Sequence, residues 1–200
     1  MVAVSFKKKE LRPGGVALVH AGASGVGTAA IQIGRALGAR IAVTAGSPEK
    51  LDRCRHLGAD VLINYHEQDF VEVMLDATGG RGANVILDNM GAVYLERNVT
   101  ALARDGRLLI IGTQGGAKAE LNINALLRKN ASVHATSLRG RPESEKAAIC
   151  AQVERNVWPW VHAGVVRPII DRVLPLRDAA YAHQLLADGA VTGKVVLSNS

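Results

Sequence analysis

The chain has 200 residues, of which 48% are hydrophobic and 21% charged, a composition that favours a folded domain and excludes a disordered chain. Its net charge of +6 permits contact with nucleic acid, but the basic residues are scattered among acidic ones, so nucleic-acid binding is not favoured. The two cysteines lie far apart, and no apolar run approaches the ~20 residues of a membrane span. The sequence also shows no secretory leader. It therefore predicts a cytoplasmic protein that has no disulfides and no membrane contact.

Short apolar runs alternate with amphipathic segments through the first two thirds of the chain. The runs are predicted strands, and the segments with apolar residues three and four positions apart are predicted helices. In chain order, strands are expected at 16–20, 40–44, 60–64, 84–88, 107–111 and 132–136, and helices at 26–37, 48–57, 70–77, 93–103 and 123–129. Strands that are apolar throughout indicate a parallel sheet covered on both faces. The sequence therefore predicts a doubly wound, six-stranded α/β fold of the Rossmann type.

Beyond Arg141 this alternation ends. A long helix is expected from Glu143 to His162, and an extended segment, a helix and a strand are expected at 165–171, 178–186 and 193–197. These elements do not fit the six-stranded sheet, so we divide the chain into an atypical segment 1–10, a dinucleotide-binding domain 11–140 and a tail 141–200. We expect the tail either to fold onto the domain or to expose apolar side chains, such as those of Ile169, Ile170, Val195 and Val196.

A glycine-rich turn directly follows the first strand. Gly25, Gly27 and Ala30 match the G-x-G-x-x-G/A pattern of dinucleotide-binding domains. Gly25 permits the sharp turn into the helix, and Gly27, which has no Cβ, lets a pyrophosphate approach the backbone. The phosphates would then meet free N–H groups at the positive end of the helix. Because a strand precedes the turn and a helix follows it, the pattern favours a bound dinucleotide over a turn without a ligand.

The end of the second strand indicates which dinucleotide is bound. Domains that bind NAD carry an Asp or Glu there, which accepts hydrogen bonds from the adenine ribose, but this strand leads into Gly46 and Ser47. Ser47 can donate a hydrogen bond to a phosphate oxygen, and Lys50 in the next helical turn can pair with the 2′-phosphate of NADPH. The sequence therefore predicts NADPH, the alternative being a helix start at which the lysine is incidental.

Several motifs together resemble one family. They are Leu11-Arg-Pro-Gly14, the segment 19–32, Thr44-Ala-Gly-Ser47, Leu57-Gly-Ala-Asp60, Ile63-Asn-Tyr65, Gly79-Gly-Arg-Gly82, Val85-Ile-Leu-Asp88, Asp105-Gly-Arg107 and Thr192-Gly-Lys194. Over residues 11–197 the chain resembles the zinc-free quinone oxidoreductases of the medium-chain dehydrogenase/reductase superfamily, the zeta-crystallin-like branch. The resemblance implies hydride transfer from NADPH to a quinone or an activated alkene. An enoyl reductase acting on acyl thioesters is the nearest alternative, and a non-catalytic module that binds a dinucleotide or nucleic acid is another.

The resemblance and the glycine turn place the cofactor at the carboxyl ends of the strands, where doubly wound sheets bind their ligands. The resemblance implies that Tyr65 lies near the adenosine phosphate, Asn89 near the centre of the cofactor and Lys194 over the site from the tail. The candidate cofactor-binding residues are Ser24, Gly25, Val26, Gly27, Thr28, Gly46, Ser47, Lys50, Tyr65, Asn89, Gly112, Thr113, Gln114, Ser137, Leu138 and Lys194. No catalytic acid or base is assigned, and no metal ligands are predicted because the histidines and cysteines lack ligand spacing.

Members of this family begin with a GroES-like catalytic domain, which residues 1–10 do not resemble. The resemblance implies that the tail normally packs on that domain. We therefore expect the chain to be the cofactor-binding half of a larger enzyme and incomplete for catalysis alone. The sixth strand would form an uncovered edge of the sheet, so we expect a homodimer through this edge, as the family resemblance also implies.

Overall fold

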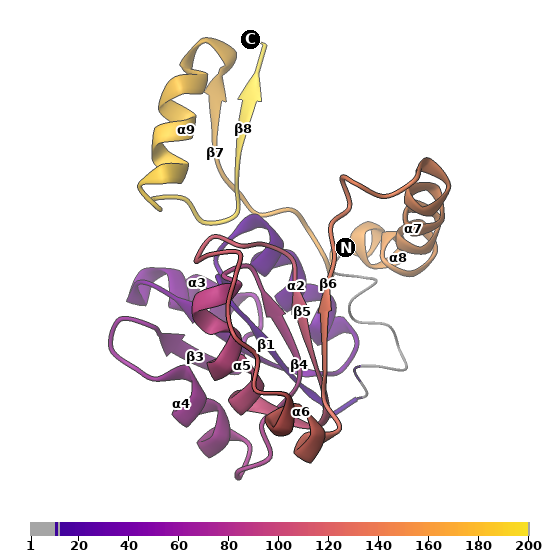
Figure 1. Ribbon diagram of the computed structural model, residues 1–200. Helices are drawn as coiled ribbons and strands as arrows, with labels where there is room; N and C mark the ends of the chain where they lie inside the picture. The colour runs from indigo at the N-terminus through magenta and orange to yellow at the C-terminus, as the bar shows by residue number, and fades with distance from the viewer. Residues whose placement is uncertain (1–10, 12, 200) are drawn as a thin grey trace.

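The computed structural model describes residues 11 and 13–199, so the segment 1–10, with Lys7, Lys8 and Lys9, lies outside the described residues. The centre of the fold is a parallel sheet with the strand order β3-β2-β1-β4-β5-β6 (Figure 1). The strands are β1 (Val16–Val19), β2 (Arg40–Ala45), β3 (Val61–Asn64), β4 (Ala83–Asp88), β5 (Leu102–Ile110) and β6 (Ser132–Ala135). The first strand lies inside the sheet and the chain winds outward on both sides of it, which confirms the doubly wound α/β fold.

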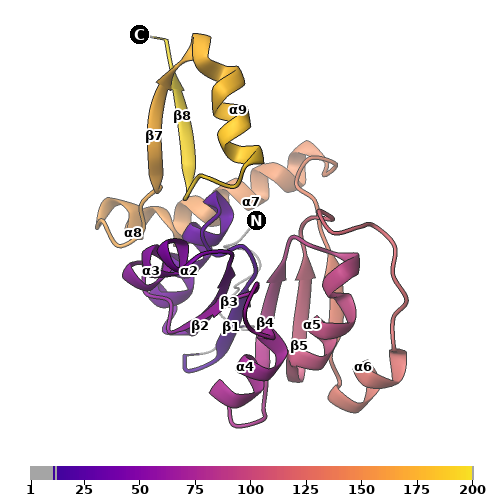
Figure 2. The ribbon, with the colours of Figure 1, turned by 90° about the vertical axis from the view of Figure 1, so that its left-hand side faces the viewer.

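Helices cover both faces of this sheet (Figures 1 and 2). They are α2 (Gly25–Ala36), α3 (Pro48–His56), α4 (Phe70–Ala77), α5 (Leu95–Ala101) and α6 (Ile123–Lys129). Ala17 and Val19 of β1 join the core under α2 and α3, whereas Val16 and Leu18 join the core under α4 and α5. Burial on both faces explains why this strand is apolar at every position. None of the helices that the structure describes combines the length and hydrophobicity of a membrane span.

The boundary between α5 and β5 differs from the prediction. The expected helix at 93–103 is wrong at its end, because α5 stops at Ala101 and β5 begins with the next residue. Ala83 of β4 pairs with Leu102, whereas Val85 pairs with Arg107, so the residues between them form a bulge. Asp105 adopts a φ of 59° within it. The Asp-Gly pair therefore marks a bulge inside a strand, not a loop between two elements.

The long helix expected at 143–162 is two helices. They are α7 (Glu143–Asn156) and α8 (Trp158–His162), which meet at Val157, a buried residue with a φ of −112°. Pro159 has no N–H to donate to the preceding turn, and its ring crowds the carbonyl there, so one continuous helix cannot form.

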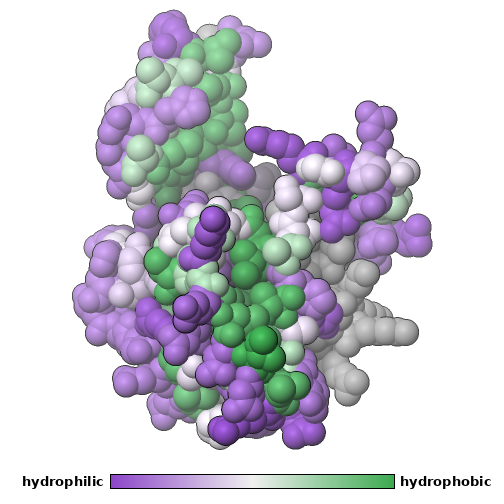
Figure 3. All heavy atoms as spheres, in the orientation of Figure 1, coloured by the Kyte–Doolittle hydropathy of each residue, from purple (hydrophilic) through white to green (hydrophobic). Residues whose placement is uncertain are grey.

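The last part of the chain forms a separate unit, the tail lobe, which comprises residues 170–198. In it β7 (Ile170–Pro175) and β8 (Lys194–Ser198) pair in parallel and α9 (Ala179–Ala187) lies beside them. Figure 1 shows this lobe standing apart from the main sheet, and Figure 3 shows apolar surface on the side of its strands. Of the four apolar residues that we named for the case of a tail not folded onto the domain, Ile170 is exposed, whereas the other three are half-buried.

Hydrogen bonds attach the tail to the glycine turn and to α2. The Gly193 N–H donates to Ala23 O over 2.8 Å, and Gly193 forms an isolated parallel bridge with Ser24. Before the lobe, the side-chain amide of Gln32 exchanges two hydrogen bonds with the backbone of Arg167, of 2.9 and 3.0 Å. The lobe therefore lies over the carboxyl ends of the strands, where the cofactor is expected.

Candidate cofactor-binding site

The glycine turn forms the N-terminus of α2. Ser24 is the N-cap, and its Oγ accepts a hydrogen bond from the Gly27 N–H over 3.0 Å. Val26 and Thr28 complete the first helical turn, which contains no acidic residue. A Cβ on Gly27 would lie 2.5 Å from the Gly22 carbonyl oxygen, so only glycine fits. Gly27 is thus required for packing of the turn, in addition to the close approach of a phosphate that the sequence predicts.

Lys194 lies across this turn from the tail lobe. A Cβ on Gly25 would overlap the end of the Lys194 side chain, with its Nζ at 2.8 Å. The ammonium group therefore stands beside the positive end of the α2 dipole. Two sources of positive potential converge on one point, which suits a pyrophosphate. The space over Gly25 is filled by the end of the Lys194 side chain, not by backbone atoms.

A buried histidine supports the turn from below. His20 Nδ1 lies 3.1 Å from Thr44 Oγ1, which also accepts a hydrogen bond from the Ala21 N–H, and His20 Nε2 lies 2.7 Å from Asn98 Oδ1. Burial lowers the pKa of His20 to about 4, so the ring is neutral near pH 7. A neutral ring that donates from Nε2 and accepts at Nδ1 satisfies both contacts. This chain of hydrogen bonds fixes the start of the glycine turn.

The residues predicted to bind the adenosine end of the cofactor lie beside β2 and β3. Ser47 caps α3, and its Oγ accepts a hydrogen bond from the Lys50 N–H over 3.3 Å. The Tyr65 hydroxyl stands over Gly46, where a Cβ would lie only 2.5 Å from it. The structure thus brings Tyr65 to Gly46, directly before the Ser47 cap of α3, as the sequence predicts, whereas the Lys50 side chain on the first turn of α3 extends to the tail.

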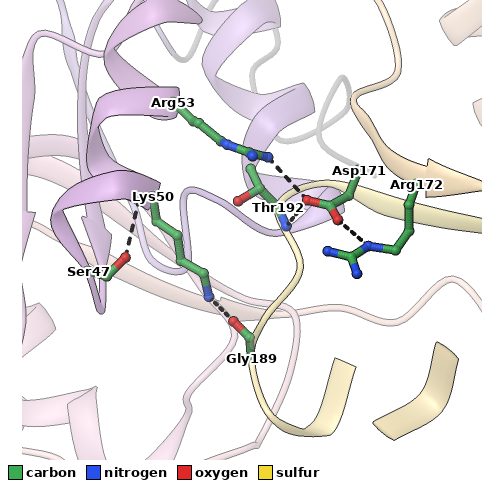
Figure 4. Close-up of polar contacts among 7 residues, drawn as sticks. All are labelled: Ser47, Lys50, Arg53, Asp171, Arg172, Gly189 and Thr192. Carbon is green, nitrogen blue, oxygen red and sulfur yellow. Dashed lines mark hydrogen bonds and ion pairs between the residues drawn. The ribbon is translucent and has the colours of Figure 1, made fainter. Parts of the chain in front are cut away.

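A cavity of about 350 Å³ opens between α3 and the tail lobe (Figure 4). Its lining is Ser47, Glu49, Lys50, Arg53, Asp171, Arg172, Gly189, Ala190 and Thr192. Lys50 Nζ donates to the carbonyl oxygen of Gly189 across the cavity. Arg53 and Arg172 are absent from the residues predicted from the sequence. Arg53 lies three positions after Lys50 on the same helix face and could have been found by that spacing, whereas nothing in the sequence places Arg172 here.

The third group of predicted residues follows β4 and β5. The Asn89 amide nitrogen donates to Gln114 Oε1 over 3.0 Å, and the Gln114 N–H donates back to Asn89 O over 3.1 Å. A Cβ on Gly112 would lie 2.9 Å from Asn89 O, so these segments are tightly packed, with Thr113 between them. Asn89 Oδ1 is buried and has no hydrogen-bond donor. An unpaired buried acceptor fits a donor on a bound cofactor, such as a ribose hydroxyl or the nicotinamide amide.

Two predicted residues stand apart. Ser137 and Leu138 follow β6, one strand beyond the Asn89–Gln114 pair, and both side chains are exposed. The other candidates form three groups, at the glycine turn with Lys194, at the adenosine end and at Asn89. All three groups lie at the carboxyl ends of the strands. The residues present therefore fit a dinucleotide.

Residues 25–152 match the family model described as zinc-binding dehydrogenase. The chain belongs to this family. It is thereby a member of the medium-chain dehydrogenase/reductase superfamily, and the expected superfamily is confirmed. Among the described residues of this family member, no group of three or more His, Cys, Asp or Glu side chains is placed to bind a metal ion.

Two curated relatives match 94% of this dehydrogenase-family chain. A 2-haloacrylate reductase from Burkholderia sp. is 30% identical over 194 residues, which are 56% of its length. A hybrid PKS-NRPS synthetase from Aspergillus niger is 35% identical over 191 residues, which are 5% of its length. The chain therefore spans about half the length of the reductase and a small part of the synthetase.

Solved structures share the fold closely. The quinone oxidoreductase of Escherichia coli complexed with NADPH has a TM-score of 0.84 and 30% identity, and the match covers 98% of this chain and 61% of that one. An NAD-dependent alcohol dehydrogenase has a TM-score of 0.82 and 36% identity, and the match covers 100% of this chain and 56% of that one. Relatives of both cofactor types are thus similar to this chain, so its own residues must indicate the choice between them.

Proposed function

We propose that this chain is the NADPH-binding portion of a zinc-free oxidoreductase that transfers hydride from NADPH to a quinone or an activated alkene. The observation on which the proposal rests is the adenosine end of the site. Gly46 and Ser47 stand where NAD-binding domains carry an acid, and Lys50 reaches into the cavity beside them. Glu49, the acid nearest to Ser47, is exposed on the first turn of α3 and does not stand at the strand end.

The nicotinamide supplies the hydride, and the chain supplies binding and orientation. The N-terminus of α2 and Lys194 would bind the pyrophosphate, while Lys50, Ser47 and Tyr65 would bind the adenosine 2′-phosphate. Asn89 Oδ1 would accept a hydrogen bond from the central or nicotinamide part of the cofactor. In this proposal no acid or base of this chain takes part in the chemical step.

A binding titration tests the choice of cofactor. The 200-residue chain should bind NADPH at least about tenfold more tightly than NADH, since a 2′-phosphate gains charge-assisted hydrogen bonds. Lys50→Gln should lower NADPH affinity about tenfold and change NADH affinity less than about twofold. Arg55→Gln, on the same helix but outside the cavity, is the matched control. Equal affinities of the wild-type chain for the two cofactors would overturn the proposal.

Relatives of two kinds bear on the substrate. The names of the 2-haloacrylate reductase and the quinone oxidoreductase support reduction of an activated alkene or a quinone. The match to a hybrid PKS-NRPS synthetase supports the second candidate, an enoyl reductase acting on acyl thioesters. NADPH oxidation should be followed with a quinone, a 2-enoate and an enoyl thioester. The chain alone should bind NADPH with little turnover, because it spans only about half of the reductase, and sustained quinone reduction would contradict this expectation.

We further propose a homodimer that forms through β6. Among the described strands, β6 pairs only with β5, so its other edge is unpaired. Pairing of two such edges around a two-fold axis would extend the sheet across both copies. Sedimentation should show a dimer at micromolar concentration. A concentration-independent monomer would reject this assembly.

A further inference from the structure

Asp171 joins the tail lobe to the cofactor helix α3. Its carboxylate accepts hydrogen bonds from Arg53 Nη1 at 3.1 Å, from Arg172 Nε at 2.8 Å and from the Thr192 N–H at 3.1 Å (Figure 4). The side chain is only 6% exposed. Burial tends to raise the pKa of this carboxyl, but the donors of Arg172, Thr192 and Arg53 outweigh burial and lower it. The carboxylate is therefore charged at neutral pH, and its bonds hold both guanidinium groups at the cavity.

The cavity holds more positive charge than Asp171 balances. The Asp171 carboxylate faces two guanidinium groups, and Lys50, which lies on α3 with Arg53, adds a third cation. Arg172 bonds Asp171 through Nε and also interacts with the Tyr181 side chain, and Figure 4 shows its terminal nitrogens on the side of Thr192 and Gly189. Glu49, which is exposed and hydrogen-bonded to Ser47, is the other acid of the lining, so three cations face two carboxylates and one positive charge is in excess.

Lys50 and Arg172 reach the same space from different parts of the chain. Lys50 comes from the domain that binds the dinucleotide, and its Nζ bonds the tail backbone at Gly189. A neutral carbonyl is a weaker partner for an ammonium group than a phosphate is, so a doubly charged ligand would displace it. Arg172 comes from β7, beyond the dinucleotide-binding domain.

We propose that Arg172 is a specificity-determining residue that binds the 2′-phosphate of NADPH, and that Asp171 positions it for this role. The inference rests on the proposed NADPH function and extends it, since it makes the tail lobe part of cofactor selection. Arg53, on α3, is the second guanidinium group that donates a hydrogen bond to Asp171. A ligand that lacks the 2′-phosphate gains no affinity from Arg172.

The test uses two probes that differ only in that phosphate, adenosine 2′,5′-bisphosphate and 5′-AMP. Calorimetry should be run on the 200-residue chain and on Arg172→Gln, Arg172→Lys and Arg177→Gln. Arg172→Gln should weaken the bisphosphate about tenfold and 5′-AMP less than about twofold. Arg172→Lys should recover part of the loss, because it restores the charge without the guanidinium geometry. Arg177→Gln removes the same charge from the tail outside the cavity and should change neither affinity.

Three results would overturn the inference. Bisphosphate affinity that is unchanged in Arg172→Gln would show that Arg172 does not touch the phosphate. An equal loss for both probes, with an unfolding midpoint below that of Arg177→Gln, would show that Arg172 only supports the fold. A loss that Arg172→Lys does not recover at all would show that charge is not its contribution. Failure of the NADPH proposal is separate, because wild-type chain would then bind the two probes equally.

Discussion

The Lys194 ammonium lies 2.8 Å from the point where a Cβ of Gly25 would stand, so the last strand of the chain presses against the first glycine of the cofactor turn. The two residues belong to different lobes, and their contact joins the tail to the phosphate site. A methyl group at Gly25 would therefore act on Lys194 first. The atoms that it meets are the far end of a flexible side chain, which can move.

Gly25→Ala and Gly27→Ala should consequently differ in kind. Gly25→Ala should displace Lys194 and weaken NADPH and NADH alike by about tenfold, with a stability change below about 1 kcal/mol. Gly27→Ala would press a methyl group against the carbonyls of Ala21 and Gly22, and should cost about 1–3 kcal/mol. Urea unfolding and cofactor titration of both variants check this contrast. Equal destabilisation by the two substitutions would argue against it.

The unpaired oxygen of Asn89 gives a second prediction. Asn89→Leu removes an acceptor that has no donor in the protein, so the lost bond to Gln114 should be offset and stability should change by less than about 1 kcal/mol. NADPH affinity should nevertheless fall about tenfold, because the cofactor would lose a hydrogen bond. Gln114→Leu removes the same internal bond but keeps the oxygen, and should affect binding less. If Asn89→Leu binds NADPH as tightly as wild type, the oxygen does not contact the cofactor.

His20 predicts how stability depends on pH. Its pKa is about 4 in the folded chain against 6.5 when unfolded, so between these values the unfolded state binds more protons. Stability should therefore fall as the pH decreases from about 6.5 to about 4, by up to about 3 kcal/mol from this one residue. His20→Gln should be less stable at pH 7 but show a flatter dependence over this range. Urea unfolding at several pH values measures it, and parallel curves for the two proteins would refute the assignment.

Lys129 stabilises the end of a neighbouring helix. Its Nζ donates to the carbonyl oxygens of Val99, Thr100 and Leu102, at 3.1, 2.6 and 2.6 Å, where α5 ends. Lys129→Met should cost about 1–3 kcal/mol, because these carbonyls lose a charged donor. Arg128→Met, one residue earlier and exposed, should cost less than about 0.5 kcal/mol. Comparison of the unfolding midpoints of the two variants shows whether the three hydrogen bonds of Lys129 stabilise the fold.

Local patterns predicted the main sheet well. The helix at 123–129 has the predicted bounds, and the glycine turn lies between β1 and α2 as its spacing requires. Each of these features depends on neighbouring residues only, through helical period, capping and turn preferences. Pro159 indicates the break between α7 and α8. The apolar residues on both sides of it nevertheless led to the prediction of one continuous helix.

Features that depend on contacts between distant segments were not predicted from the sequence. The bulge at Asp105 depends on pairing with β4, which the residues of β5 do not encode by themselves. Arg172 lies at the cavity because contacts between distant segments bring the tail to α3, among them the ion pair of Asp171 with Arg53, 118 positions away in sequence. The candidate site was thus predictable where it follows from the sheet, and not where the tail lobe returns to it.

The bridge between Ser24 and Gly193 has a consequence for the order of events during synthesis. Both partners must leave the ribosome before the phosphate site is complete, so the glycine turn waits for Gly193, which is far behind it in the sequence. A nascent chain released before Gly193 would hold a finished sheet with an open cofactor site. Cofactor binding would then report that translation has reached the last strand.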